Sequence, residues 1–222
     1  MLSGCPYALF LPELRLMHMR APGMRKLVIA SNNSGKVREF DKALRPLGFK
    51  TFSLQEAGFE GRPEEEGGYS ENALQKARAV CRATGLPTLA DDSGLEVDAL
   101  GGLPGPASQR YLGPEATPED RNRDVLRCLE GLPLERRSAR FRCVLALCFP
   151  EGQEIVAEET CQGAIALAPT GEGGFGYDPI FQLPDGRAMA QLTPEEKNQV
   201  SHRGKALRRL LGTLSSDNSS DL

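Results

Sequence analysis

The 222-residue sequence contains no tryptophan, only two histidines and no pair of cysteines with C-x-x-C spacing. Zinc sites are built from clustered cysteines and histidines, so the scarcity of histidine argues against one. Four of the six cysteines lie in apolar segments, which indicates reduced thiols in a cytoplasmic protein. Any metal is therefore expected to be a hard cation bound by carboxylate and phosphate oxygens.

Long apolar runs and an excess of basic charge are also missing. No stretch approaches the roughly 20 apolar residues of a membrane-spanning helix. Residues 1–23 lack the basic start and long apolar run of a secretory signal. The 27 basic residues are outnumbered by 30 acidic ones, which argues against a protein that binds duplex nucleic acid. We expect neither a membrane nor a nucleic-acid partner.

What the chain does have is many turn formers, with 24 glycines and 16 prolines. Three prolines in 1–23 predict a loose N-terminal extension, and the polar residues of 215–222 predict a frayed C-terminal tail. No repeat or linker divides the remainder, so 24–214 is predicted to form one α/β domain.

Periodicity predicts strands and helices that alternate in the first half, followed by a run of strands. The expected strands are 27–31, 50–54, 86–90, 95–100, 138–149, 154–162, 163–168 and 180–183. The expected helices are 37–44, 71–84, 117–131, 193–196 and 201–214. This order predicts a mixed sheet with flanking helices, arranged as two lobes that share the sheet.

A polar segment separates the first expected strand from the first expected helix. It consists of Ser31, Asn32, Asn33, Ser34, Gly35 and Lys36. Backbone N–H groups at a helix start favour an anion and Lys36 adds positive charge, so a phosphate site is predicted. It is not a P-loop, because Ala30 and Val37 stand where that motif needs glycine and Ser/Thr. The alternative is an ordinary turn capped by Ser34.

Two adjacent aspartates, Asp91 and Asp92, precede Ser93 and Gly94 in an expected turn between strands. Neighbouring side chains at a strand end point to opposite faces, so only one aspartate can face a given cleft. The other is expected to hold the loop by accepting hydrogen bonds from backbone amides. The pattern suits Mg²⁺ coordination and water activation. The alternative is an Asx-type turn without function.

Two later motifs offer groups that suit a purine base. In 171–179, Phe175 and Tyr177 provide flat faces among glycines that let the backbone approach a ligand. In 201–205, His202 and Arg203 project donors from a helix start that Ser201 can cap. A plain hairpin loop and a basic surface helix are the respective alternatives.

Taken in order, six motifs resemble those of the inosine triphosphate pyrophosphatase family, the enzymes that remove non-canonical purine nucleotides. They are S-N-N-x-G-K, E-N-A-x-x-K-A, D-D-S-G-L-x-V, G-G-x-P-G, G-x-G-G-F-G-Y-D-P and S-H-R-G-x-A-L, spread over 25–214. The resemblance implies hydrolysis of ITP, dITP and XTP to the monophosphate and pyrophosphate with Mg²⁺. It also implies an elongated, two-lobed homodimer with the nucleotide in the cleft between the lobes.

The resemblance also assigns roles to residues of this chain. Asp92 would be the catalytic acid and a metal ligand, with Glu64, or a residue one position away, as the second ligand. The expected substrate-binding residues are Ser31, Asn32, Asn33, Ser34, Gly35, Lys36, Lys76, Ser93, Phe175, Gly176, Tyr177, Asp178, Lys197, His202 and Arg203. Asp92 would orient or deprotonate a water that attacks the α-phosphorus. His202 or Arg203 would donate a hydrogen bond to O6 of the base.

The chain departs from the family pattern at three places, the first being Asn32, which replaces a common glycine and can adopt the same left-handed backbone. Glu66 and Gly68 stand where glycine and Ser/Thr are usual, which leaves the second metal carboxylate open. For 64–66 taken alone, a solvated loop is the better interpretation. The run 106–110 also differs from the family, so the wall of the pocket is expected to differ there.

Two rival functions remain from the sequence. One is a pyrophosphatase of modified pyrimidine triphosphates, which the G-G-F-G-Y-D run disfavours. The other is a non-catalytic nucleotide sensor or RNA-binding module that uses Phe175 and Tyr177 for stacking. The adjacent aspartates and the acidic balance of the chain argue against this second rival.

Overall fold

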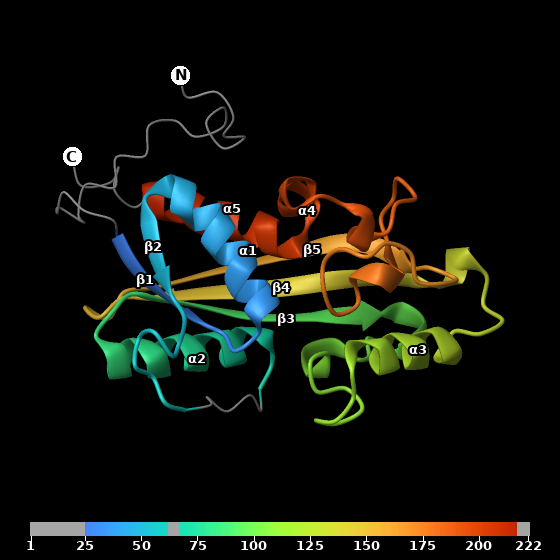
Figure 1. Ribbon diagram of the computed structural model, residues 1–222, viewed down its shortest axis with the longest axis horizontal. Coiled ribbons are helices and arrows are strands. Elements are labelled where there is room, and N and C mark those ends of the chain that lie inside the picture. Colours follow the sequence, from blue (N-terminus) through green and yellow to red (C-terminus); the bar gives the residue numbers. More distant parts are fainter. Residues whose placement is uncertain (1–24, 62–66, 217–222) are drawn as a thin grey trace, which may run out of the picture.

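The computed structural model describes residues 25–61 and 67–216, and within them a six-stranded mixed sheet forms the centre (Figure 1). Its strands are β1 (Arg25–Ala30), β2 (Phe49–Phe52), β3 (Thr88–Val97), β4 (Ser138–Cys148), β5 (Glu154–Ile165) and β6 (Phe181–Gln182). The strand order is β2-β1-β3-β4-β5-β6. β1 runs parallel to both of its neighbours, and all other pairs are antiparallel. The predicted mixed α/β sheet is confirmed.

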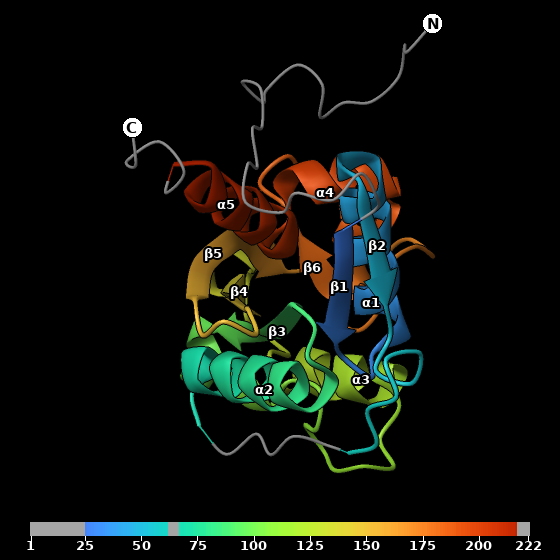
Figure 2. The ribbon, with the colours of Figure 1, turned by 90° about the vertical axis from the view of Figure 1, so that its left-hand side faces the viewer.

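Helices cover both faces of this sheet. They are α1 (Ser34–Leu44), α2 (Tyr69–Thr84), α3 (Pro118–Cys128), α4 (Pro194–Val200) and α5 (His202–Ser216). α1, α4 and α5 lie on one side of the sheet, and α2 and α3 lie on the other (Figures 1 and 2). Within the described part of the chain, none of the helices has the length and apolar character needed to cross a bilayer.

The hydrophobic core of the described residues contains three clusters. The first two belong to one lobe and the third to the other. Leu27, Phe40 and Leu210 belong to a cluster that packs α1 and α5 on the sheet, and a second cluster packs α2 against the opposite face. A third cluster packs α3 and the segment after β5 around the far halves of β3, β4 and β5; Val125 and Phe181 belong to it. The long strands β3, β4 and β5 therefore carry both lobes, as expected.

The predicted turn at Asp91–Gly94 is wrong, because β3 runs unbroken from Thr88 to Val97. β4 pairs with β3 residue by residue from Thr88↔Cys148 to Val97↔Ala139. This pairing provides hydrogen bonds for the backbone of the strand. The turn preference of Asp, Ser and Gly therefore does not decide the local structure.

The predicted break between 154–162 and 163–168 is also wrong, because β5 passes through Gly163. Gly163 pairs with Ala139, and a Cβ on it would meet the carbonyl of Gln182 and the ring of Phe181. The glycine therefore admits β6 beside β5 rather than ending the strand.

The predicted helix start at Thr117 is confirmed. The Thr117 side chain accepts from the Asp120 amide and the Asp120 carboxylate accepts from the Thr117 amide, with Pro118 in the first turn. Predictions for 1–23 and for most of 215–222 lie outside the described residues.

Candidate functional site

A cavity of about 330 Å³ lies between the two lobes. Most of the predicted substrate-binding residues line it: Asn33, Ser34, Gly35, Lys36, Ser93, Phe175, Gly176, Tyr177, Asp178, His202 and Arg203. Ser108, Gln109, Arg121 and Phe141, which were not predicted as site residues, also contribute to the wall. Segments that are far apart in the sequence thus meet at one hollow.

The N-terminal end of α1 forms one end of this cavity. Asn33, and not Ser34, caps the helix, since Asn33 Oδ1 accepts from the amides of Gly35 (2.9 Å) and Lys36 (3.2 Å). Ser31 steadies the turn by accepting from the Asn33 amide at 3.2 Å. Ser31 and Asn32 do not line the cavity, and Asn32 is exposed.

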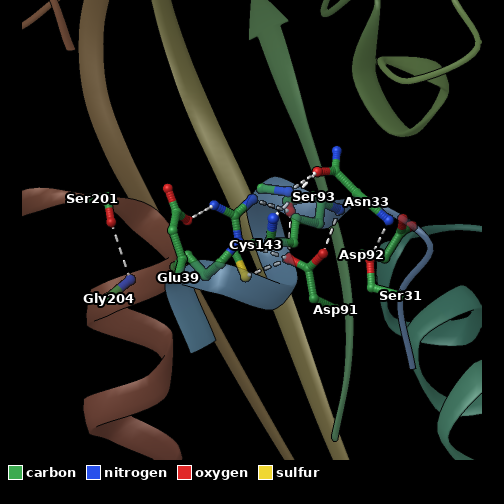
Figure 3. A network of polar contacts seen from close by, with 12 residues as sticks. Ser31, Asn33, Glu39, Asp91, Asp92, Ser93, Cys143, Ser201 and Gly204 are labelled. Atoms are coloured by element: carbon green, nitrogen blue, oxygen red, sulfur yellow. Dashed lines mark hydrogen bonds and ion pairs between the residues drawn. The ribbon is translucent and has the colours of Figure 1, made fainter. Parts of the chain in front are cut away.

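Asp91 does not hold a loop through backbone amides, and that prediction is wrong. Its buried carboxylate forms an ion pair with Lys36 and accepts from Ser93 Oγ (2.5 Å) and Cys143 Sγ (3.5 Å) (Figure 3). Arg203 Nε approaches the same carboxylate at 3.3 Å. Burial alone would raise the pKa of Asp91, but Lys36 and Arg203 hold it well below its usual range.

An ion-pair chain extends from Asp91 through five further residues, of which only Glu39 was not indicated by the motifs. In order, it runs Lys36, Asp91, Arg203, Glu39, Lys197 and Asp178. Glu39 of α1 pairs with Arg203 and lies 2.7 Å from Lys197 Nζ, and Lys197 Nζ lies 2.6 Å from Asp178 Oδ2. The signal that could have found Glu39 is its place three residues after Lys36 on the same helix.

Asp92 points to the opposite face of β3, as the alternation of a strand requires. Its Oδ2 accepts from Asn72 Nδ2 at 3.0 Å, and its Oδ1 lies 3.5 Å from Lys76 Nζ. Lys76 Nζ also donates to the Asp91 carbonyl at 2.8 Å. Burial raises the pKa of Asp92, and Lys76 and Asn72 oppose that shift. Asp92 and Lys76 are therefore adjacent to each other, although neither lines the cavity.

The Asp92 carboxylate has the chemistry of a ligand for a hard cation such as Mg²⁺. Among the described residues, its Oδ1 has only a long contact, 3.5 Å, with Lys76 Nζ. Asn72, which the sequence analysis missed as a site residue, bonds both Asp92 and the amide of Gly67 (2.9 Å). Glu64 lies outside the described residues, and the described ranges hold no group of three potential metal-binding side chains. Asp92 thus fits one ligand position of such a site.

Residues 174–178, here called the base loop, form another part of the cavity wall, next to the start of α1. Phe175 packs on Gly35, since a Cβ on that glycine would lie 2.6 Å from the ring, and Lys197 Nζ lies 4.5 Å from the ring centre. The Asp178 carboxylate accepts from the Phe175 amide at 2.7 Å. Burial raises the pKa of Asp178, and Lys197 opposes the shift. Lys197 therefore stabilises the base loop through its ion pair with Asp178 and its contact with the Phe175 ring.

His202 forms part of the buried wall. Its ring stacks on Phe141 with a centroid distance of 4.7 Å, and its Nδ1 has no hydrogen-bond partner among the described residues. Burial, reinforced by the neighbouring Arg203, lowers the pKa of His202 well below its usual value. The imidazole is therefore neutral at pH 7 and keeps an unused polar atom. Ser201 caps α5 as predicted, accepting from the Gly204 amide at 3.1 Å (Figure 3).

The fold and the cavity together define an α/β protein that can hold an elongated, partly anionic ligand between two lobes. A model of the Ham1 family matches residues 27–213, so the chain belongs to the Ham1 family. This confirms the resemblance predicted from the motifs.

Individual relatives agree with that assignment. The dITP/XTP pyrophosphatase of Geobacillus kaustophilus is 50% identical over 191 residues, which cover 84% of this chain and 93% of the relative. That of Thermus thermophilus is 50% identical over 187 residues, with 84% of this chain and 90% of the relative covered. A solved structure of a HAM1 protein from Coxiella burnetii is 43% identical, has a TM-score of 0.77, and matches 87% of this chain and 100% of its own.

Proposed function

We propose that this protein hydrolyses the non-canonical purine nucleotides ITP, dITP and XTP to the monophosphate and pyrophosphate. The observation that carries the proposal is one cavity that is lined by the lysine-bearing start of α1, by the base loop and by His202. The relatives named dITP/XTP pyrophosphatase support the same activity.

The phosphate end must offset about four negative charges of a triphosphate before any nucleophile can approach. Lys36 supplies positive charge at the first turn of α1, and Lys76 supplies it beside Asp92. Asp92 would hold Mg²⁺ together with Glu64, or with a residue one position away, and the metal would supply the remaining neutralisation. Asp92 orients the attacking water and accepts its proton as the water oxygen bonds to the α-phosphorus. The bond from that phosphorus to the oxygen that bridges it to the β-phosphate breaks, and pyrophosphate leaves with this oxygen.

Base selectivity requires a donor where hypoxanthine and xanthine carry O6 and adenine carries an amine. His202 or Arg203 supplies this donor, because both line the cavity. Adenine would leave that buried donor unpaired, a penalty that can reach several orders of magnitude in kcat/KM.

The decisive assay incubates the protein with ITP, XTP, dTTP or ATP plus Mg²⁺ and measures pyrophosphate against orthophosphate. Pyrophosphate from ITP and XTP is the expected result. Orthophosphate would indicate cleavage at the γ-phosphate, preferential turnover of dTTP would favour a pyrimidine enzyme, and no turnover would favour a nucleotide sensor.

The proposal extends to the assembly and location of the protein. We expect a homodimer in the cytoplasm, with no membrane and no nucleic-acid partner. Four of the cysteines are buried and free of disulfides, which is consistent with a reducing compartment. Sedimentation equilibrium tests the dimer, and a monomer mass across micromolar concentrations would refute it.

A further inference from the structure

The base loop is tied to the rest of the molecule at three points. Lys197 holds it through Asp178, as described above. The Tyr177 hydroxyl donates to the Ser108 carbonyl at 2.8 Å, and the Gly176 carbonyl accepts from Asn122 Nδ2 of α3 at 3.0 Å. The last tie joins α3 directly to a residue that lines the cavity.

Asn122 is an unexpected residue at its position in α3. Its side chain is buried, and its Oδ1 has no hydrogen-bond partner among the described residues. A buried amide oxygen without a partner destabilises a fold, so an apolar residue would suit the packing of α3 better. The contact that distinguishes asparagine here is the hydrogen bond from Nδ2 to Gly176.

Gly176 depends on that hydrogen bond because side-chain packing does not fix it. Its φ of +62° lies in the left-handed region, and no described atom lies within 4 Å of the place a Cβ would take. Loss of the Asn122 donor would leave this peptide free to turn between the rings of Phe175 and Tyr177, which have contacts of their own.

The residue before Asn122 holds the neighbouring wall of the cavity. Arg121 Nε donates to the Tyr111 carbonyl at 2.8 Å, and Arg121 itself lines the cavity. Consecutive residues of α3 therefore hold the base loop and the segment that follows Ser108. The helix acts as a support for both walls around the end of the cavity assigned to the base.

We infer that Asn122 is a positioning residue that fixes the base loop and thereby sets the preference for 6-oxopurine over 6-aminopurine triphosphates. The inference rests on the proposed function. Asn122 contacts the loop and not the reacting atoms, so its loss changes base discrimination more than the chemical step.

The test compares kcat and KM for ITP and ATP in the parent and in Asn122→Leu and Asn122→Asp variants. Leucine removes the donor, and aspartate keeps the size but places an oxygen against the Gly176 carbonyl. We expect the ratio of kcat/KM for ITP to that for ATP to fall about tenfold, with most of the change in KM for ITP. The kcat for ITP is expected to stay within about threefold of the parent.

The control is Arg123→Ala on the exposed side of α3, where the arginine pairs with Asp120 at 3.3 Å. This variant is expected to keep the parent's ratio. If the leucine variant does not fold, as judged by circular dichroism, the aspartate variant decides. A parent that releases no pyrophosphate from ITP refutes the proposed function, and the inference with it. An active parent whose Asn122 variants keep the ITP-to-ATP ratio overturns the inference alone, even if their activity falls.

Discussion

Two aspartates that are adjacent in the chain meet different surroundings because a strand sends them to opposite faces. Asp91 is paired with Lys36 and Arg203, so its charge is offset within the protein. Asp92 has one oxygen held by Asn72 and the other at 3.5 Å from Lys76. The aspartate whose charge is less offset is therefore the one assigned to the reaction.

Replacement of Asp92 by asparagine tests this assignment. We expect kcat for ITP to fall by about 10³-fold, because the variant loses the proton acceptor. Binding of a non-hydrolysable ITP analogue, measured by calorimetry without Mg²⁺, should stay within a few-fold of the parent, because Asp92 does not line the cavity. Turnover within a few-fold of the parent would remove Asp92 from its role.

The lowered pKa of His202 predicts how stability depends on pH. In the unfolded chain a histidine takes up a proton below pH of about 6.5, whereas the folded protein keeps His202 neutral to a lower pH. Its contribution to stability is fully present above pH 6.5 and is lost as the pH falls from there toward the folded pKa. This loss amounts to about 1.4 kcal/mol at pH 5.5 relative to pH 7.5.

Urea unfolding of the parent and a His202→Gln variant at both pH values measures the loss. Carboxylates titrate in the same pH range in both proteins. The difference between their free energies of unfolding therefore reports the contribution of His202. If His202→Gln has the parent's pH dependence, the imidazole titrates normally in the fold.

At the scale of elements, the sequence located most helices and strands and misplaced those decided by long-range pairing. Helix α3 was predictable because its capping box is local. The continuity of β3 depends on β4, about 50 residues away in the chain, which local turn preferences cannot reveal. In the site, the motifs indicated most residues of the cavity wall, but Asn122 and Ser108 act through neighbours that are distant in sequence.

The close approach of β6 to β5 predicts opposite effects for two Gly→Ala substitutions. In Gly163→Ala the new methyl group would lie 2.7 Å from the Phe181 ring, so we expect a loss of about 1–3 kcal/mol in the free energy of unfolding. In Gly212→Ala, on α5, no described atom lies within 4 Å of the new carbon. That variant should gain up to about 1 kcal/mol from helix propensity. Urea denaturation measures both, and an unaffected Gly163→Ala would contradict the packing described.

In the molecule as a whole, the ion-pair chain connects secondary-structure elements, most of which are far apart in the sequence. It links β3 to α5, α5 to α1, α1 to α4 and α4 to the base loop. Three acidic and three basic side chains alternate along it. Removal of one side chain therefore leaves the charges of its neighbours only partly neutralised. Glu39 has the central position, because it bridges Arg203 and Lys197.

Glu39→Gln therefore tests whether this chain stabilises the assembled lobes. Its carboxylate is 29% exposed, so we expect the free energy of unfolding to fall by about 2 kcal/mol, less than the loss of a fully buried partner would cause. Glu154→Gln is the matched control, because its carboxylate is similarly exposed (31%) but its partner Arg78 is 42% exposed. The partners of Glu39 are buried, so loss of the Glu154 pair should cost less, under about 1 kcal/mol. Urea denaturation at 0.1 and 1 M NaCl separates the two, because salt screens exposed pairs more than buried ones. The Glu154 contribution should shrink at high salt while the Glu39 contribution persists. Equal and equally salt-sensitive losses would place Glu39 among ordinary surface charges, and the two lobes would then depend on the shared strands alone.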